Sequence, residues 1–318
     1  MQSSTQTGLL IKTISPFCLL QDLGRFGYKH YGVTHSGAID PYLLRVANKL
    51  VGNKSNEACL EFTSLGGKFE VTAKSMRIAF AGDFPLSVNG KSALAFSSIY
   101  LSQGDVLNIA PSTGGIRGYL SVEGGFAVEP ELGSCSTHTR SKLGGFTEPL
   151  KTGMVLPVKL PFASEGPEAF LNQCLRRPER DCIRVIEGPQ CEYFSSKGLR
   201  DFYAKPFIIS NESDRMGYRL DGNDIEFEKR GDMISEPTLY GSVQVPPSGK
   251  PVVLMADCGT SGGYPKIATV VTVDRGLLAQ KGPGTEFYFE AISVEQAQSL
   301  LRHQEDYFSK LNLRLMKN

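Results

Sequence analysis

The chain has 318 residues, 34 of them basic and 33 acidic, and a formal net charge of +1. Hydrophobic residues make up 41% and charged residues 21%, which is typical of a folded globular protein and argues against long disordered regions. Because the two signs of charge are interspersed, the chain offers no basic face for a run of phosphates, and nucleic acid is not an expected partner.

Short apolar runs bounded by Gly, Pro, Asn and Asp fill the first half of the chain, which predicts many strands joined by tight turns. In chain order, examples are GLLIKTI at 8–14, KFEVTA at 68–73, MRIAFAG at 76–82 and RGYLSVEGG at 117–125. One helix is predicted among them, over residues 40–52. Asp40 is a favourable N-cap for this helix and Pro41 suits its first position.

The second half continues in the same way, with CIRVIEG at 182–188, KPFIIS at 205–210 and TEFYFEAI at 285–292. A second helix is expected over residues 293–315, where Ser293 is followed by acid and amide residues close to capping-box spacing. Residues 160–180, rich in Pro and charge, separate the halves. We therefore expect a mainly β protein with two domains, residues 1–180 and 181–318.

The N-terminal residues lack the basic segment and apolar stretch of a secretory signal, and no apolar run is long enough to span a membrane. We expect a cytoplasmic protein with no membrane contact. The seven cysteines include no Cys-x-x-Cys pair and the four histidines no metal-ligand spacing, so reduced thiols and no metal site are expected. Cys258 is disfavoured as a nucleophile because the adjacent Asp257 would raise the pKa of its thiol.

The first polar cluster lies in the glycine-rich segment 21–53. Asp22 and Arg25 are candidate ligand-binding residues there, because the glycines allow turns that present side chains to a ligand. The alternative is that these two residues pair with each other and brace the loop. Asp40 is interpreted as a helix cap.

The second cluster is ISNESDRMGYRLDGN at 209–223. Arg215 and Arg219 flank Met216, Gly217 and Tyr218, and arginine side chains suit carboxylate or phosphate oxygens. The alternative for either arginine is a salt bridge between the two domains.

The third cluster covers residues 235–284. VPPSGKP at 245–251 predicts a turn between two strands. We expect Gln244 and Asp257 to lie near the ends of these strands away from the turn, where they would converge. Asp257 would accept or relay a proton there.

A loop rich in hydroxyl groups and glycine follows in the same cluster. Thr260, Ser261 and the amides of Gly262 and Gly263 are suitable donors to an oxyanion, and Lys266 would neutralise it. TSGG is also the sequence of an ordinary turn, so the residues alone leave both interpretations open.

Ordered motifs along nearly the whole chain resemble one protein family. They are QDLGRFGYKHYGV, GAID, ANKLVGN, GYLSVEGGF, LGSCST, SDRMGYRLDG, QVPPSGKPVVLMAD, GGYPKIATV and LAQKGPG. The family is variously named the C subunit of 5-oxoprolinase, KipA, allophanate hydrolase subunit 2 and biotin-dependent carboxyltransferase. The resemblance implies two cyclophilin-like β-barrel domains with a few short helices, and a KipI-like B subunit as partner.

For a chain of this length, the resemblance implies the C subunit of an ATP-dependent 5-oxoprolinase, a hydrolase acting on a cyclic amide. With the B and A subunits it would open 5-oxo-L-proline to L-glutamate, with ATP bound together with the partner protein. One alternative is the carboxyltransferase component of a urea carboxylase or allophanate system, which alone would require biotin. The other is a non-catalytic, KipA-like regulator that binds a KipI-like partner.

Combining these residues with the resemblance gives a candidate site. The candidate catalytic residues are Asp257, Lys266 and Arg215, which would orient the substrate amide and stabilise charge developing on oxygen. The candidate substrate-binding residues are Asp22, Arg25, Tyr218, Gln244, Thr260, Gly262, Gly263 and Tyr264.

Overall fold

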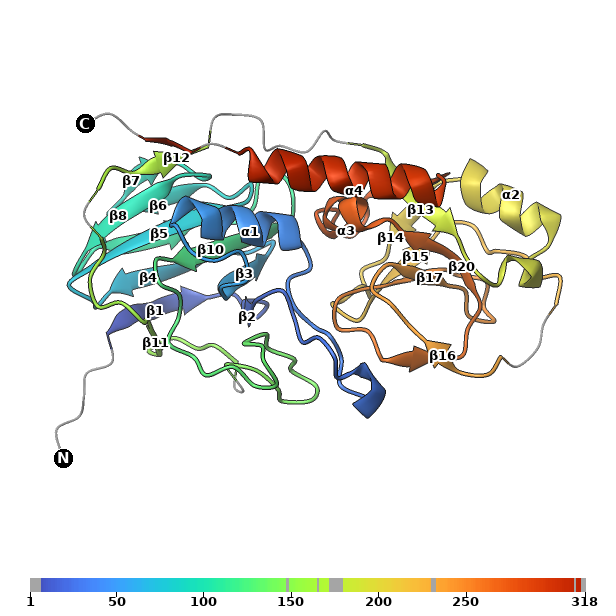
Figure 1. Cartoon of the computed structure of the whole chain (residues 1–318), viewed down its shortest axis with the longest axis horizontal. Helices are drawn as coiled ribbons and strands as arrows, with labels where there is room; N and C mark the ends of the chain where they lie inside the picture. The colour runs from blue at the N-terminus through green and yellow to red at the C-terminus, as the bar shows by residue number, and fades with distance from the viewer. Residues whose placement is uncertain are drawn as a thin grey trace. The chain divides into compact units, whose positions relative to one another are not determined.

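The computed structural model describes residues 7–146, 149–164, 166–171, 180–229, 233–311 and 313–315. Contacts divide the chain into two compact units, which Figure 1 shows in ribbon form. Unit 1 holds the described parts of 1–25, 40–175 and 312–318, and unit 2 holds those of 26–39 and 176–311. The sequence predicts a single domain boundary at residue 180, which stays a prediction. It does not predict that residues 26–39 belong to unit 2.

Unit 1 is built from two antiparallel sheets, with strand orders β11-β1-β4-β9-β6-β7 and β2-β3-β10-β5-β8. A helix, α1 (Pro41–Leu50), packs on β10 and β5. The strands are β1 Gly8–Ile14, β2 Leu19–Gln21, β3 Cys59–Thr63, β4 Gly67–Val71, β5 Ser75–Ala81, β6 Leu86–Val88, β7 Lys91–Ala93, β8 Ser98–Ser102, β9 Val106–Ile109, β10 Arg117–Val122 and β11 Val155–Pro157.

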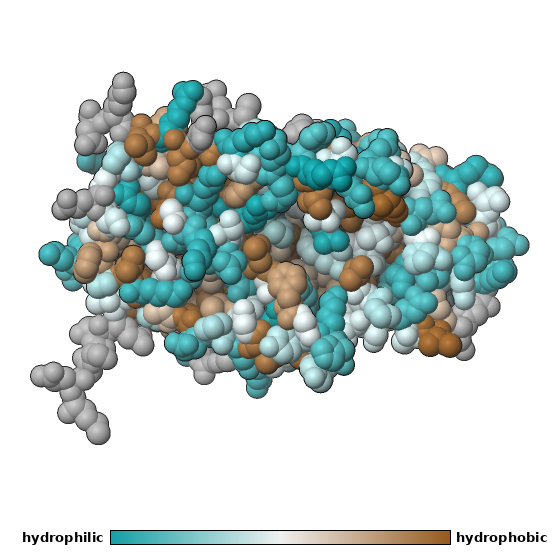
Figure 2. All heavy atoms as spheres, in the orientation of Figure 1, coloured by the Kyte–Doolittle hydropathy of each residue, from teal (hydrophilic) through white to brown (hydrophobic). Residues whose placement is uncertain are grey.

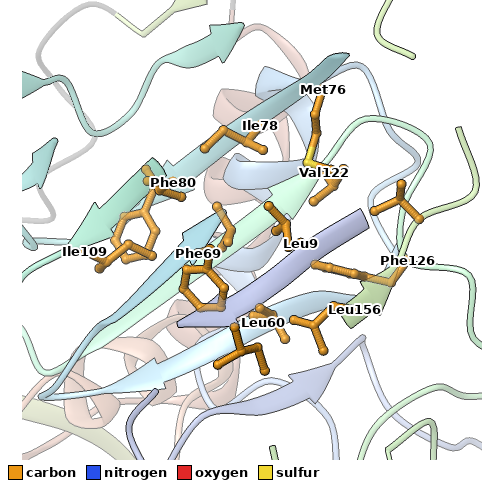
Figure 3. Close-up of a cluster of buried hydrophobic side chains, with 14 of the residues drawn as sticks. Leu9, Leu60, Phe69, Met76, Ile78, Phe80, Ile109, Val122, Phe126 and Leu156 are labelled. Atoms are coloured by element: carbon orange, nitrogen blue, oxygen red, sulfur yellow. The ribbon is translucent and has the colours of Figure 1, made fainter. Parts of the chain in front are cut away.

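The core of unit 1 follows from the alternation of side chains along its strands. In β4, Phe69 and Val71 are buried, whereas Lys68 is exposed. The inward-facing residues of both sheets form one apolar cluster, part of which Figure 3 shows. Leu60 and Phe80 join it from the five-stranded sheet. Facing sheets that share an apolar layer are a stable arrangement for strands of this pattern.

Unit 2 is a closed barrel with the strand order β13-β20-β17-β18-β15-β14-β21. Its strands are β13 Cys182–Glu187, β14 Phe207–Ile209, β15 Gly217–Asp221, β17 Ser242–Gln244, β18 Val252–Leu254, β20 Lys266–Val270 and β21 Glu286–Ala291. A short ribbon pairs β16 (Glu236–Pro237) with β19 (Ser261–Gly262). The helices are η1 Lys29–Tyr31, η2 Cys191–Tyr193, α2 Ser196–Ala204, α3 Thr272–Ala279 and α4 Val294–Ser309.

Aromatic side chains fill the barrel and fix helix α2 to it. Phe202 of α2 stacks on Phe289 of β21 with ring centroids 4.6 Å apart, and both belong to the buried apolar cluster of unit 2. The predicted fold, mainly β with two barrel domains and a few short helices, is confirmed in its class and in the barrel of unit 2. In the described residues the closed barrel is that of unit 2, and the strands of unit 1 pair as two sheets.

The predicted helix starts are confirmed by their caps. The Asp40 side chain accepts from the Leu43 amide, and Ser293 and Gln296 form a reciprocal capping box at the start of α4. The predicted end of the second helix is wrong, because α4 ends at Ser309. Residues Arg314–Leu315 form β22, which pairs with β12 (Ala169–Phe170). The leucines at 311, 313 and 315 alternate with period two, which is a strand pattern.

None of the helices among the described residues is long and apolar enough to cross a membrane. Figure 2 shows hydrophilic side chains along α4, whose exposed residues include Glu295 and Arg302. The partly buried Leu300 and the buried Phe308 account for the other side of the helix. This division is the amphipathic pattern of a helix lying on a protein surface.

Candidate functional site

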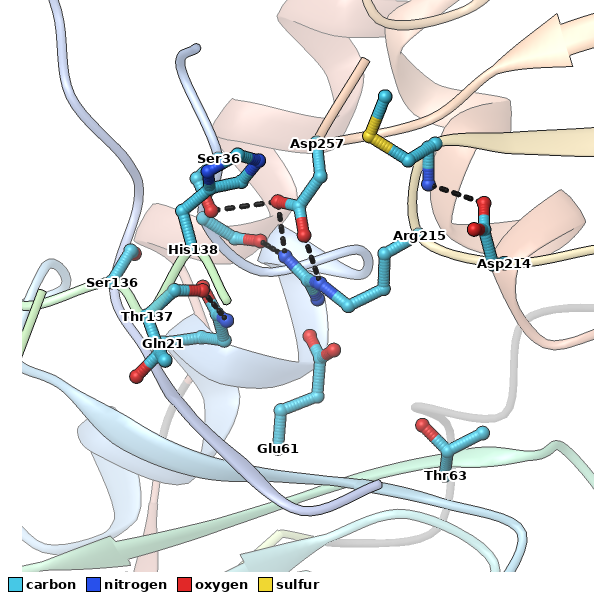
Figure 4. A network of polar contacts seen from close by, with 12 residues as sticks. Gln21, Ser36, Glu61, Thr63, Ser136, Thr137, His138, Asp214, Arg215 and Asp257 are labelled. Carbon is cyan, nitrogen blue, oxygen red and sulfur yellow. Dashed lines mark hydrogen bonds and ion pairs between the residues drawn. The ribbon is translucent and has the colours of Figure 1, made fainter. Parts of the chain in front are cut away.

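An ion pair between Arg215 and Asp257 is the centre of a polar network in unit 2 (Figure 4). Arg215 Nε donates to Asp257 Oδ2 at 2.8 Å, and its Nη2 donates to Oδ1 at 2.9 Å. Ser36 Oγ donates to the same Oδ1 at 2.7 Å. The Nη2 of Arg215 also donates to the Gly37 carbonyl at 2.7 Å. Asp257 is 5% exposed, so these donors replace water around its carboxylate.

Strand pairing explains why these two charges meet. Arg215 lies just before β15 and Asp257 just after β18, and the strands are antiparallel with Gly217 opposite Leu254. The residues beyond the paired ends therefore come together, and the Asp257 amide donates to the Arg215 carbonyl at 2.9 Å. Of the two interpretations of Arg215, the structure shows an ion pair, and its partner lies in the same unit.

Ser36 is held in a conformation that few residues with a Cβ adopt. Its φ is 53°, in the left-handed region, and Gly37 follows with a φ of 93°. Such residues persist where the surroundings fix them, and they concentrate at functional sites. The Tyr240 hydroxyl anchors the same segment by donating to the Ile39 carbonyl at 2.7 Å. The sequence candidates omit Ser36, and its separation of 221 residues from Asp257 explains why.

A second network surrounds Lys266 at the start of β20. Its Nζ donates to Glu236 Oε2 at 2.7 Å, and Gln190 Nε2 donates to the same oxygen at 2.9 Å. Gln190 Oε1 also accepts from the Lys266 amide at 3.1 Å. The Lys266 side chain is 8% exposed, whereas that of Glu236 is 44% exposed. The ammonium group is therefore buried, whereas the carboxylate that pairs with it is partly exposed to solvent. The sequence candidates omit both Gln190 and Glu236.

The glycine loop packs against this second network through Gln244, which lies opposite Lys266 in the β17–β20 pairing. A Cβ on Gly262 would approach Gln244 Nε2 to 2.7 Å, so a side chain there would displace the amide. Gln244 Nε2 donates to the Tyr264 carbonyl at 3.3 Å, and the Tyr264 side chain is exposed. Gly263 is partly buried next to them.

Thr260, in the same loop, is used through its backbone. Its carbonyl accepts from the Thr238 amide at 3.1 Å, next to the ribbon of β16 and β19. The loop is thus a tight turn that also packs against the Lys266 network. The sequence leaves open whether it is a turn or part of a site, and the loop has features of both.

The expectation that Gln244 and Asp257 converge away from the turn is wrong. Gln244 pairs with Val252, next to the turn, whereas Asp257 follows the opposite end of β18. In the described part of the chain, no hydrogen bond or ion pair joins Asp257 to Lys266. Each charge has its own partner, Arg215 for one and Glu236 for the other. The predicted catalytic residues therefore lie in two networks.

Tyr218 is a core residue of the barrel. It is 2% exposed within the apolar cluster, and its hydroxyl donates to the Ala279 carbonyl at 3.3 Å. A buried tyrosine normally finds such a partner, and this contact accounts for its polar group. The structure gives Tyr218 a packing role and no position facing a ligand.

Asp22 and Arg25, in unit 1, brace one loop. Asp22 accepts from the hydroxyls of Ser134 and Ser136 and from the amides of Gly24 and Cys135. Arg25, 1% exposed, donates to the carbonyls of Ser136 and Glu131. Asp22 and Arg25 therefore brace a loop, as the second interpretation expects. Their hydrogen-bond partners lie in loop 131–136.

Two further atoms in unit 1 need a partner that the described chain does not provide. Gln21 Oε1 and Thr137 Oγ1 are buried and make no hydrogen bond there. Gln21 Nε2 donates to the Thr137 carbonyl at 2.9 Å, which fixes the amide so that Oε1 is the unsatisfied acceptor (Figure 4). An unsatisfied buried acceptor costs about 1–3 kcal/mol, so a ligand N–H or a water would be stabilising here. Neither residue is among the sequence candidates.

The cysteines show no sign of nucleophilic chemistry. Among the described residues six are free, and Cys174 lies outside them. Burial raises the pKa of Cys135 and of Cys191 each to about 11. It also raises the pKa of Cys258, with a smaller contribution from Asp257. Within the same residues, no group of three His, Cys, Asp or Glu side chains is arranged to hold a metal ion.

The Lys266 network should be visible in the pH dependence of stability. The hydrogen bond from Lys266 lowers the pKa of Glu236 below its ordinary value of 4.5. A carboxyl group with a lowered pKa stabilises the fold above its unfolded pKa, and this contribution is lost as pH falls through the folded pKa. We expect Glu236→Gln to reduce the loss of unfolding free energy between about pH 6 and about pH 3. Urea unfolding at several pH values measures this, with the exposed Glu212→Gln as control, and identical slopes for wild type and Glu236→Gln would contradict it.

The chain thus contains a closed barrel with charge networks at its strand ends and, as a second unit, two antiparallel sheets. Residues 31–291 match the family model described as carboxyltransferase domain, subdomain A and B, and the chain belongs to this family. The family resemblance found in the sequence is thereby confirmed.

Individual proteins are also similar to this chain. The chain is 36% identical to the 5-oxoprolinase C subunit of Haemophilus influenzae, with 92% of this chain and 94% of that protein covered. It is 33% identical to the 5-oxoprolinase C subunit of Escherichia coli, with 94% and 96% covered. The structure of K. lactis urea amidolyase superposes with a TM-score of 0.90 at 25% identity, over 100% of this chain and 21% of that one. A further solved relative has a TM-score of 0.80 at 36% identity, and this chain spans 57% of its length.

Proposed function

We propose that this chain is the C subunit of an ATP-dependent 5-oxoprolinase, which acts with the B and A subunits to open 5-oxo-L-proline to L-glutamate. The observation that carries the proposal is the mutual coverage of the matches. The two relatives named as 5-oxoprolinase C subunits are covered over 94% and 96% of their length, whereas two urea amidolyases are covered over 17% and 16%. A match along nearly all of both chains supports the same role in the same kind of complex.

The Lys266 network supports a carboxylate-binding role within this function. 5-Oxoproline is an anion at neutral pH, and Lys266 is a buried cation whose counter-charge, Glu236, reaches solvent. Substrate would displace Glu236 and gain a charged hydrogen bond from Nζ, while Gln190 and Gln244 offer further amide groups. The Gly262–Gly263 turn leaves this side of the network without bulky side chains.

Asp257 and Arg215 suit a positioning role better than direct contact with substrate. The carboxylate of Asp257 already accepts from Arg215 and Ser36, so neither oxygen is without a donor. Their buried pair fixes Ser36 and Gly37 against the barrel end. Asp257 would therefore act on the substrate through the geometry of this segment.

ATP would activate the lactam carbonyl in the assembled enzyme. The sequence has no GxxxxGK[ST] loop, and we assign nucleotide binding to the complex with the B subunit.

The second candidate function is carboxyl transfer from carboxybiotin to urea. It is favoured by the superposition on K. lactis urea amidolyase over 100% of this chain. In this case biotin would be supplied by another protein. A regulatory protein that binds a KipI-like partner without catalysis is the remaining alternative.

The test is ATP hydrolysis by the chain purified with its B and A partners. We expect 5-oxoproline to stimulate hydrolysis and L-glutamate to form in equal amount, with no allophanate formed from urea and carboxybiotin in a parallel assay without ATP. Allophanate formation without any stimulation of ATP hydrolysis by 5-oxoproline would overturn the proposal in favour of carboxyl transfer. Neither activity, with the complex intact by size-exclusion chromatography, would favour a regulatory role.

A further inference from the structure

Two cationic side chains of unit 2, Lys29 and Arg275, take no part in the ion pairs described above. Lys29 of η1 donates from Nζ to the Thr238 carbonyl at 2.8 Å. Arg275 of α3 lies with its guanidinium carbon 5.1 Å from the centre of the Tyr240 ring. Cys258 lies beside Thr238, and both are almost fully buried. Four separate segments of the barrel unit thus contribute to one cluster.

Arg275 is a partly buried cation without a carboxylate. Its Nε is buried and has no hydrogen-bond partner in the described chain, and no ion pair to it is found there. Burial lowers the pKa of Arg275, and the ionisable groups that oppose this shift are Tyr240 and Cys258. Buried arginines are normally paired, because the desolvation of an unpaired charge is costly. The stacking on Tyr240 offsets only part of that cost.

Lys29 brings a second positive charge to the surroundings of Thr238 and Cys258. The hydrogen bond of its side chain goes to the Thr238 carbonyl, a neutral group. Both Lys29 and Arg275 act on the Cys258 thiol, yet burial keeps the pKa of that thiol above its ordinary value. The thiol is therefore neutral near pH 7 and supplies no counter-charge. The adjacent Asp257 is already bound to Arg215.

The backbone is shaped to admit the guanidinium group. Gly241 has a φ of 95°, and a Cβ on it would lie 3.2 Å from Arg275 Nε and 3.0 Å from the Val270 carbonyl. A glycine at this position therefore allows close approach of the Arg275 side chain. The Nε atom without a hydrogen-bond partner therefore belongs to a side chain that is packed against the backbone, and not to a loosely held surface arginine.

We propose that Lys29 and Arg275 bind a small oxyanion, a carboxylate or a phosphate, next to Thr238 and Cys258. The anion supplies the missing acceptor for Arg275 Nε and the missing counter-charge for both cations. Planar guanidinium groups recognise both classes of anion through paired N–H donors. The ion pair of Lys266 is with Glu236 and includes neither Lys29 nor Arg275, and the proposal stands whether or not the chain is part of a 5-oxoprolinase.

The experiment follows the Nε–H resonance of Arg275 in the ¹⁵N-labelled full chain. The resonance is identified by its loss in Arg275→Met. We expect sodium phosphate or a carboxylate, tested as acetate, 5-oxoproline and glutamate, to shift it in a saturable way at constant ionic strength. Sodium chloride should leave it in place. Saturation by phosphate alone assigns a phosphoryl ligand, and saturation by carboxylates alone assigns a carboxylate ligand.

Calorimetric titration with the anion that saturates the resonance gives the affinity. Loss of a charged hydrogen bond should raise Kd roughly tenfold or more in both Arg275→Met and Lys29→Met. Arg200→Met, which removes an exposed arginine of α2, is the matched control and should leave Kd unchanged. A Kd that is equal in wild type, Arg275→Met and Lys29→Met would overturn the proposal. So would a resonance that no oxyanion shifts, or that chloride shifts equally.

Discussion

Replacing Asp257 by Ala should lower the unfolding free energy of the chain by about 3–5 kcal/mol, the usual cost of leaving one partner of a buried ion pair alone. The side chains of Arg215 and Asp257 are 13% and 7% exposed, so water cannot replace the lost carboxylate around the guanidinium. Ser36 would lose its acceptor in the same variant while keeping its left-handed backbone. Urea unfolding followed by circular dichroism measures the change, provided that the m-value stays constant.

The exposed pair Lys250–Asp221 provides the matched control. Its side chains are 56% and 49% exposed, and Asp221→Ala should therefore cost less than about 1 kcal/mol. A double variant, Arg215→Met with Asp257→Leu, should recover part of the loss, because it removes both charges and fills their space. If Asp257→Ala costs no more than Asp221→Ala, the pair does not hold the barrel end together.

Local signals in the sequence are sufficient for most elements of the fold. Alternation and turn residues predict the strands, and the caps at Asp40 and Ser293 predict where two helices begin. The predicted end of the last helix is wrong because helical periodicity does not continue to 315, through residues that alternate as a strand. Closure of the barrel of unit 2 and the two-sheet pairing of unit 1 depend on long-range register, which no local pattern contains.

The candidate site is predictable residue by residue but not as an arrangement. Asp257, Lys266 and Arg215 are all largely buried charges, as their surroundings of glycine and short strands suggest. Their predicted grouping is wrong, because it depends on which end of β18 carries Asp257. Glu236 escapes sequence reasoning because its contact with Lys266 joins residues 30 apart that only the β16–β19 ribbon brings together. When tertiary contacts alone bring two charged residues together, their positions in the sequence show no characteristic spacing.

Loss of the Lys266 ammonium should have the largest effect on activity. If the chain is part of a 5-oxoprolinase, Lys266→Met should lower kcat/KM of the complex for 5-oxoproline by about 10²–10³-fold, the range seen when one preorganised donor to a developing charge is removed. Folding should change little, because Glu236 is left in a solvent-exposed position. Steady-state kinetics of the assembled complex measure this, and Lys250→Met, which removes an exposed lysine, should leave kcat/KM unchanged.

The division between KM and kcat separates binding of the substrate carboxylate from stabilisation of the transition state. A rise in KM alone would mean that Lys266 contacts the carboxylate equally in both states, whereas a fall in kcat would mean that its charge acts on the reacting carbonyl. Glu236→Gln should then lower KM, because the carboxylate that competes for the Lys266 side chain is gone. Full activity of Lys266→Met, or a raised KM in Glu236→Gln, would remove Lys266 from the site and leave its pair with Glu236 as a structural contact.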